Sequence, residues 1–403
     1  MTNIYAALEI GTTRTVLAVG EAEADGRLKV SCHAEIPSAG VRKSRILDIG
    51  QATQSIRSVL HEVERRQADA GASITIGNAM LAVSGQHIKA DLFTGSAQIE
   101  GARVGDADIA EAAEHARSMP LPKDRELLDV VDQDYSLDGM GGILDPKGMA
   151  GRVLSLGALH IHADRNRIED ARTAAGGAHL EIREPLFAAT CAADAVLEDH
   201  ERRNGVLVLD LGGGSTGYAA FSDGFLASAG AVGVGGDHVT NDIAHAFQTT
   251  QAQAEALKTG FASAMIGRDG DGTSRVKIPG TTPLMESRTV SRKALDTVVN
   301  ARLRELFAII RETLEDQDLL HRLHSGVVLT GGGAAMRDIG DLAQRELGMS
   351  VRTGTPMHVD GLSGESAPAS FAAAAGALMY AHRSYAEKPL FGGLGGLFGG
   401  LFK

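Results

Sequence analysis

The chain of 403 residues contains only two cysteines, Cys32 and Cys191, and they lie far apart in the sequence. Two isolated cysteines give neither a disulfide framework nor the ligand spacing of a zinc site. We therefore expect a protein of a reducing cytoplasm.

Basic residues are few relative to acidic ones. Lys and Arg total 39 against 51 Asp and Glu, which gives a net charge of -12, and no long basic run is present. Phosphate backbones attract basic patches, so this balance argues against a nucleic-acid-binding body. The hydrophobic content of 43% is ordinary for a globular chain, and the length suits two or three domains.

Long apolar runs are missing as well. No window reaches the roughly 18 apolar residues that a spanning helix needs. The N-terminal MTNIYAALEIG has no charged leader before an apolar stretch. We expect neither a secretion signal nor a spanning helix, which leaves the tail PLFGGLGGLFGGLFK, residues 389–403, as the only candidate membrane contact.

On a helix at about 100° per residue, the large apolar side chains of this tail fall within one arc of roughly 140°, opposite all its glycines. Each glycine costs about 1 kcal/mol relative to alanine, so the helix should not hold in water. Full burial of the apolar side chains would contribute on the order of 10 to 20 kcal/mol, and shallow insertion less. An apolar surface, either lipid or protein, could therefore order the tail. Its apolar residues are Leu390, Phe391, Leu394, Leu397, Phe398, Leu401 and Phe402.

Three short apolar strands end in glycine-rich turns, at 5–15, 205–216 and 326–336. In the first two, an acid is the next-to-last strand residue (Glu9, Asp210), and about 200 residues separate them, which suggests a duplicated domain. Strand-like sequence follows each of these two turns, as in hairpins. A helix candidate follows the third turn.

Amphipathic helical stretches alternate with these strands, which predicts an α/β protein with mostly buried sheets. Residues 83–162 read as a small insert of three strands and one helix, and the polar segment 268–290 predicts a surface loop or short hairpin. The predicted helices cover 51–70, 184–201, 237–247, 293–315 and 371–383.

The glycine-rich turns have a composition that could bind a phosphate group. Without side chains in the way, backbone N–H groups can point at a phosphate oxygen, and Ser or Thr hydroxyls add donors. One such turn more often serves only as a tight turn, but two related turns with preceding carboxylates favour a phosphate site. Because carboxylates beside phosphates need a cation, Glu9 and Asp210 indicate Mg²⁺ held through water. Solvation at a strand end is the alternative for the two acids.

The turns EIGTTRT, DLGGGST and VLTGGGAAM resemble the phosphate and adenosine motifs of the actin, Hsp70 and sugar-kinase superfamily. Within it the chain is similar to the FtsA family of bacterial cell-division actin homologues, on ALEIGTTRTVLAVGE, LAVSGQHI, DHVTNDIAHAF, GVVLTGGG and a terminal amphipathic segment. The resemblance implies an actin-like ATPase fold, with two related halves around a nucleotide cleft and a small inserted domain.

The resemblance also divides the chain into five parts. It implies a first half (1A) at 1–82 and 163–204, an inserted domain (1C) at 83–162, a second half (2A) at 205–246 and 321–385, a subdomain 2B at 247–320, and a short linker with the membrane-targeting segment at 386–403.

ATP and Mg²⁺ are the implied cofactors, with Glu9 and Asp210 positioning the metal and water. Glu255 and Lys258 match ribose or base contacts, although residues three apart on a helix more commonly form an exposed ion pair. The implied nucleotide-binding residues are Gly11, Thr12, Thr13, Arg14, Gly212, Gly213, Gly214, Ser215, Gly235, Gly236, Glu255, Lys258, Gly331, Gly332, Gly333 and Met336.

The implied partners are the C-terminal peptide of FtsZ, further copies of the chain in a filament, other division proteins through the insert, and membrane lipid. The implied place is the cytoplasmic side of the membrane at the division site, as a peripheral protein. Arg302 is the best-matched peptide partner, and Arg292, Lys293 and Arg304 could equally form a solvated helix face.

Several positions depart from the family pattern. Arg14 stands where family members commonly have lysine, and its guanidinium keeps the positive charge but adds a planar, forked set of hydrogen-bond donors. Gly217 and Tyr218 replace Met-Asp, and the segment where actins orient the attacking water has alanines and one threonine. We therefore expect slow hydrolysis at most, with ATP acting mainly as a switch. The alternatives are an FtsA-like scaffold of another membrane machine, such as a pilus platform, or a small-molecule kinase of the same fold.

Overall fold

The structure is a computed structural model, and it describes residues 4–23, 26–72, 74–268, 274–278, 287–362 and 368–386. The predicted membrane segment, residues 389–403 with its seven apolar side chains, lies outside them. Among the described helices, none is both long and apolar enough to cross a bilayer.

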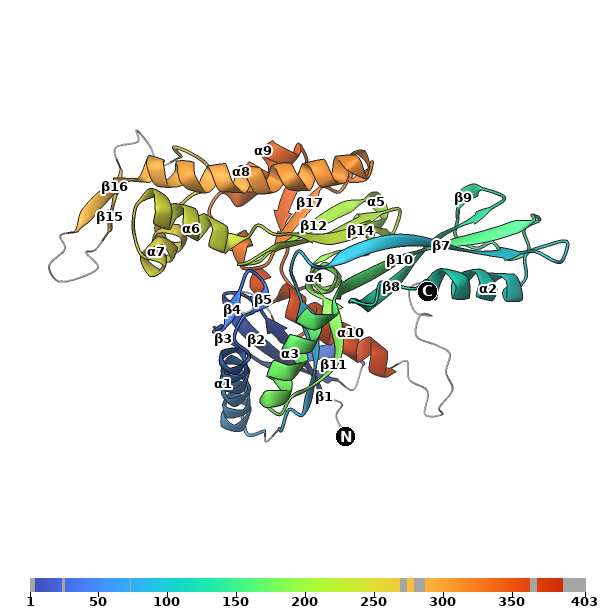
Figure 1. The fold of residues 1–403 in the computed structure, drawn as a ribbon, viewed down its shortest axis with the longest axis horizontal. Helices are drawn as coiled ribbons and strands as arrows, with labels where there is room; N and C mark the ends of the chain where they lie inside the picture. Colours follow the sequence, from blue (N-terminus) through green and yellow to red (C-terminus); the bar gives the residue numbers. More distant parts are fainter. Residues whose placement is uncertain are drawn as a thin grey trace.

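Two five-stranded sheets form the body of the molecule, one above the other in Figure 1, and they share one topology. In each, an antiparallel hairpin leads to a third antiparallel strand on one side and to two parallel strands on the other. The predicted hairpins and the predicted duplication are thus confirmed. The first sheet runs β11 (Glu181–Phe187), β6 (Asn78–Val83), β1 (Ile4–Ile10), β2 (Arg14–Ala22), β3 (Leu28–Pro37); the second runs β14 (Phe225–Val232), β13 (Thr216–Ser222), β12 (Val206–Leu211), β17 (Val327–Thr330), β18 (Val351–Thr353).

Alternation along β12 joins two hydrophobic cores, because successive side chains of a strand point to opposite faces. Val206 and Val208 belong to the core shared with the first sheet, whereas Leu207, Leu209 and Leu211 belong to the core of the second half. Helices α4 (Ala188–Val196) and α10 (Ala372–Ala386) lie in the shared layer, and α1 (Ile49–Asp69) with α3 (Arg165–Gly177) packs on the other side of the first sheet. The second half is covered by α6 (Gly236–Ala246), α7 (Gln251–Phe261), α8 (Arg292–Asp316) and α9 (Ile339–Leu347).

Helices α4 and α10 pack closely because small residues face each other. A Cβ on Gly376 of α10 would overlap the Cys191 carbonyl oxygen of α4 and lie 2.8 Å from Cys191 Cα. Their close approach fixes the layer between the two sheets, and so the position of both glycine turns relative to each other.

The insert forms its own sheet at one side of the molecule (Figure 1). Its helix lies over one face, and Gly95 permits this because a Cβ there would overlap Ala116 N and lie 2.7 Å from Ala116 Cα. The predicted three strands and one helix are present, with one further short strand. The sheet order is β7 (Lys89–Gln98), β10 (Val153–Asp164), β8 (Arg125–Leu137), β9 (Met140–Ile143), and the helix is α2 (Asp106–Arg117).

One predicted helix, 184–201, is wrong over part of its length. Residues 181–187 form strand β11, which extends the parallel ladder of β6, and helix α4 begins only at Ala188. The helix then breaks at Leu197 and Glu198, whose backbones are extended. A capping box starts α5 (Asp199–Asn204), with the Glu198 N–H donating to Glu201 Oε2 at 2.9 Å.

The polar segment 268–290 contains a short hairpin where it is described. Strands β15 (Arg275–Ile278) and β16 (Arg288–Ser291) pair antiparallel, with Val276 opposite Val290. This outcome agrees with the predicted loop or hairpin.

Candidate functional site

The two glycine turns have the same internal geometry. Gly11 N–H donates to the Arg14 carbonyl at 3.0 Å, and Gly212 N–H donates to the Ser215 carbonyl at 3.0 Å. A Cβ at either glycine would lie 2.8 Å from the same carbonyl oxygen. Each hairpin turn is therefore tight enough to need glycine at its first position.

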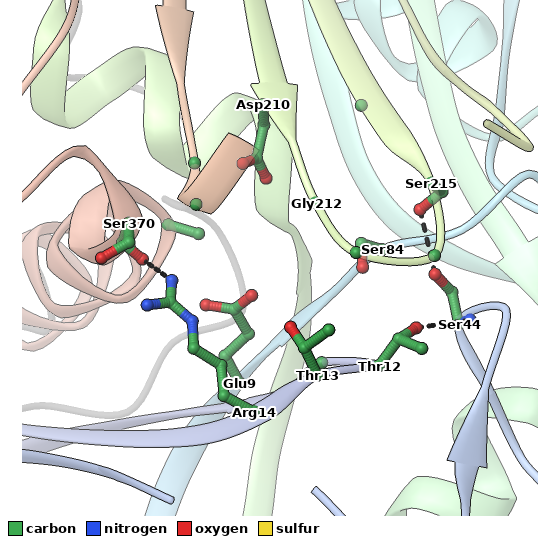
Figure 2. Close-up of a pocket in the computed structure, with 17 residues that line it drawn as sticks. Glu9, Thr12, Thr13, Arg14, Ser44, Ser84, Asp210, Gly212, Ser215 and Ser370 are labelled. Carbon is green, nitrogen blue, oxygen red and sulfur yellow. Dashed lines mark hydrogen bonds between the residues drawn. The ribbon is translucent and has the colours of Figure 1, made fainter. Parts of the chain in front are cut away.

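The turns come from opposite halves and face each other across a cavity (Figure 2). A Cβ on Gly213 would lie 2.7 Å from Thr13 Cγ2, and a Cβ on Gly214 would overlap Thr12 Oγ1. The cavity between the turns has a volume of about 50 Å³. Its lining comprises Glu9, Gly11, Thr12, Thr13, Arg14, Ser44, Ser84, Asp210, Gly212, Gly213, Gly214, Ser215, Gly217, Gly331, Gly332, Ser370 and Ala373.

Two carboxylates point into this cavity from the ends of β1 and β12 (Figure 2). Burial raises the pKa of Glu9 from 4.5 to about 7, and the Arg14 guanidinium partly offsets this rise. Burial likewise raises the pKa of Asp210 to about 6. The Oε2 atom of Glu9 is buried without a hydrogen-bond partner. Neither acid therefore has the solvated surroundings of an ordinary strand end.

Gly331 makes room for one of these acids. Its φ of +79° suits glycine, and a Cβ there would overlap Asp210 Oδ1 and lie 2.8 Å from Leu211 N. The third glycine turn thus packs directly on the Asp210 carboxylate at the end of β12.

The raised pKa of Glu9 predicts a pH-dependent stability. Between 4.5 and about 7 the folded state keeps a proton that the unfolded chain has lost, so the folded state becomes less stable as pH rises through this window. Glu9→Gln stays neutral, and we expect it to be more stable than the wild type at about pH 8 by about 2 kcal/mol, with little difference at about pH 4. Urea unfolding at the two pH values measures this difference, and equal pH slopes for the two proteins would contradict it.

The acids suit Mg²⁺ by chemistry. Oxygen ligands and bound water are what Mg²⁺ prefers, and a cation would satisfy the orphaned Glu9 oxygen. Among the described residues no group of three or more His, Cys, Asp or Glu could hold a metal directly. The residues present therefore fit a Mg²⁺ ion that Glu9 and Asp210 would hold through bound water molecules.

Gly235 and Gly236 lie behind the second turn, outside the lining of the cavity. Gly236 N–H donates to the Gly212 carbonyl at 3.0 Å, and a Cβ on Gly235 would lie 2.5 Å from the Gly213 oxygen. Helix α6 therefore begins against this turn and holds its backbone in place.

Glu255 and Lys258 form the ion pair that their spacing allows, at 2.7 Å. Both also bond the Thr240 hydroxyl, at 2.6 and 2.8 Å, and Lys258 Nζ donates to the Gly236 carbonyl at 3.2 Å. The pair thus braces the start of α6 and is not among the residues that line the cavity. Gly333 packs on Leu211, and Met336 packs on the second core; these two are not lining residues either.

Arg14 turns away from the two glycine turns (Figure 2). Its guanidinium donates to Glu35 at 2.6 Å and to the Ser370 carbonyl, and it lies over the Phe371 ring. The side chain is 21% exposed and is the one cation among the described residues that line the cavity.

Besides Gly217, four lining residues were not among the predicted site residues: Ser44, Ser84, Ser370 and Ala373. They come from a hairpin, the end of β6 and the start of α10, far from the glycine turns in the chain. Two local signals could have found members of this set: the run VRKSRI around Ser44, and the family-like motif LAVSGQHI, which contains Ser84.

The basic residues predicted for peptide binding lie on α8 and differ in their bonding. Arg302 already makes a fork to Asp242, at 2.6 and 3.0 Å, and bonds Glu305 at 2.6 Å. Arg304 pairs with Glu346 at 3.0 Å. Lys293 is exposed and has no ion pair among the described residues, whereas Arg292 is half-buried.

The sequence matches two family descriptions. Residues 207–376 match Cell division protein FtsA, and residues 85–162 match the SHS2 domain inserted in FtsA. Cell division protein FtsA of Pseudomonas aeruginosa is 32% identical over 93% of this chain and 88% of its own length. FtsA of Escherichia coli is 29% identical, over 94% of this chain and 90% of its own.

Solved structures agree on the fold. The PilM–PilN type IV pilus biogenesis complex aligns with a TM-score of 0.62 at 18% identity, over 93% of this chain and 97% of that one. An MreB of Spiroplasma citri bound to ADP aligns with a TM-score of 0.56 at 13% identity, over 94% and 96% of the two chains. The fold is therefore actin-like, with an inserted SHS2 domain, as predicted.

Proposed function

The chain belongs to the FtsA family of cell division proteins, and on that premise we propose that it binds ATP with Mg²⁺, forms filaments and tethers the FtsZ ring to the membrane. It would act as a peripheral protein on the cytoplasmic side, at the division site. The predicted domain limits, 1C at 83–162 and 2B at 247–320 among them, are part of this proposal.

One observation carries the nucleotide proposal: two glycine turns of the same geometry and two half-buried carboxylates converge on one cavity. The turns would cradle the phosphates, Gly331 and Gly332 would border the base side, and Glu9 with Asp210 would hold Mg²⁺ through water. Bound Mg²⁺ would neutralise phosphate charge. Titration of the purified protein with Mg-ATP tests the proposal, and saturable binding that fails without Mg²⁺ is the expected result. A protein that binds no adenine nucleotide would contradict it.

Slow hydrolysis at most is also part of the proposal. Where an actin orients the attacking water, α4 has alanines and Thr190, whose hydroxyl already donates to the Phe187 carbonyl at 2.9 Å. The segment therefore offers no side-chain amide where an actin has its glutamine, and the Thr190 hydroxyl proton is already used. ATP would serve mainly to hold the two halves together.

Lys293 is the residue of α8 that we expect to bind the FtsZ peptide, because Arg302 already forms ion pairs with two carboxylates. An exposed charge pair contributes about 0.2–1 kcal/mol, so Lys293→Glu should weaken binding of an acidic FtsZ C-terminal peptide by about threefold or more. Fluorescence anisotropy of a labelled peptide measures this change.

The matched control for Lys293 is Lys89→Glu, an equal charge reversal on an exposed residue of the inserted domain. It should leave the peptide affinity unchanged. Equal weakening by both variants would show that only net charge matters, and no weakening by Lys293→Glu would remove this residue from the proposed peptide site.

Membrane attachment would come from the tail 389–403. Its apolar arc can insert, and Lys388 with Lys403 are the only nearby cations, so insertion would contribute more than attraction to anionic lipid. A single weak anchor binds reversibly, whereas a filament binds through many anchors at once. Self-association, with the inserted domain as a contact, would therefore control attachment.

A further inference from the structure

A short hairpin that the glycine motifs do not include reaches into the same cavity. Strands β4 (Val41–Arg42) and β5 (Arg45–Ile46) pair antiparallel around the two-residue turn of Lys43 and Ser44. Its base is held by the Gly40 carbonyl, which accepts from Leu47 N–H at 2.7 Å.

The turn has an unusual backbone for its residues. Lys43 and Ser44 have φ of 50° and 54°, which is the left-handed region that hairpin turns of this length usually fill with Asn and Gly. Non-glycine residues in that region are strained, and such strain often marks functional sites.

Ser44 links the two halves of the molecule through its backbone and its side chain. Its N–H donates to Thr12 Oγ1 of the first turn at 2.9 Å, and its hydroxyl lies 3.0 Å from the Ser215 hydroxyl of the second turn (Figure 2). Gly214 permits this approach, because a Cβ there would lie 2.7 Å from Ser44 N. The hydroxyl therefore sits between the two turns proposed to hold phosphate.

The hairpin also carries unpaired charge. Arg42, Lys43 and Arg45 are exposed, and within the described part of the chain none of them has an ion pair or a side-chain hydrogen bond. The charges of the hairpin act on the first turn of α6. Burial and, after it, the Lys43 ammonium lower the pKa of His238, and the Arg42 guanidinium opposes the burial that raises the pKa of Asp237.

The cavity lacks cations for a triphosphate. Arg14 is the one cation among its described lining residues, and its guanidinium is bound by Glu35 and Ser370. Lys258 is bound by Glu255. The cations of the hairpin are next in the chain to the lining residue Ser44 or one position further, and among the described residues they have no such carboxylate partner.

From this geometry we infer that the β4–β5 hairpin is a third phosphate-binding element, in which the Ser44 hydroxyl and the Lys43 ammonium bind the terminal phosphate of a nucleoside triphosphate. The inference rests on the proposed ATP binding. Because the hairpin belongs to the first half and Ser44 contacts Ser215 of the second, a bound terminal phosphate would join the halves through this turn. A diphosphate, which lacks that group, would leave the hairpin unengaged.

Two variants test the inference in the full chain. Ser44→Gly keeps the left-handed turn, where glycine is favourable, and removes only the hydroxyl. Lys43→Gln removes the charge at similar size. Hydrogen bonds that involve charged groups are the strong ones, so each variant should weaken Mg-ATP binding by about tenfold and Mg-ADP binding by about twofold or less. Lys89→Gln, at an exposed lysine of the inserted domain that does not line the cavity, is the matched control and should change neither affinity by more than about twofold.

Isothermal titration with Mg-ATP and Mg-ADP gives the affinities, and thermal unfolding checks that each variant folds. Equal losses for ATP and ADP, or a loss in Lys89→Gln as large as in Lys43→Gln, would overturn the inference, as would variants that bind ATP like the wild type. If the wild type binds neither nucleotide, the proposed function itself fails. The two failures are thus distinguishable.

Discussion

Gly214→Val should weaken Mg-ATP binding by about 100-fold or more, because a side chain at this position has no space. A Cβ there would overlap Thr12 Oγ1 and lie within 2.9 Å of Ser44 Oγ. The added valine would therefore force the two turns apart and occupy the space between them. Titration calorimetry against the wild type measures the loss.

A glycine in open space provides the control for this substitution. Gly260, on α7, has no atom within 4 Å of an added Cβ, so Gly260→Val should leave nucleotide affinity unchanged. Thermal unfolding of both variants separates a blocked cleft from a misfolded protein. A folded Gly214→Val protein with wild-type affinity would mean that nucleotide does not bind between these turns.

Removal of residues 389–403 should abolish most binding to liposomes. The lost segment holds the seven apolar side chains of the predicted arc, and even shallow insertion of these contributes several kcal/mol, so we expect a loss of about tenfold or more. Co-sedimentation with liposomes, with and without the tail, measures this loss. Nucleotide binding by the truncated protein serves as the check that its body is intact.

The composition of the tail offers a finer control. Replacing Leu394 and Phe398 by Gln removes part of the apolar arc at unchanged length and charge, and should weaken liposome binding. Replacing Gly393 and Gly396 by Ser, on the opposite side, should have a much smaller effect. If the truncated and full-length proteins sedimented equally, the anchor would have to lie elsewhere in the chain.

Much of the fold follows from local pattern. The strand, acid and glycine order around Glu9 and Asp210 predicts two hairpins of one kind, and the two sheets share one topology. Helices α1, α6 and α8 end within a few residues of their predicted limits. These features could be predicted because each is encoded by neighbouring residues.

What the sequence analysis missed depends on contacts between distant residues. Ser44 and Ser370 reach the cavity only because separate elements fold against it, and no local period signals this. Arg14 follows a phosphate-like turn, yet Glu35 of β3 and the Ser370 carbonyl hold its guanidinium elsewhere. The helix predicted at 184–201 failed for the same kind of reason, because pairing with β6 makes 181–187 a strand.

The pattern of buried charge suggests how nucleotide would act on this protein. Glu9 and Asp210 have raised pKa values because burial disfavours their charged forms, and the Mg²⁺ ion that accompanies the nucleotide would place positive charge beside them. Ligand binding would therefore stabilise the closed cleft, and with it the relation between the two halves that a filament contact requires.

Electron microscopy of the purified protein on a lipid monolayer, with and without Mg-ATP, tests whether nucleotide controls assembly on the membrane. We expect ordered filaments on the lipid in the presence of Mg-ATP and sparse, unordered particles in its absence. Filaments that form equally well without nucleotide, or protein that never gathers on the lipid, would contradict it.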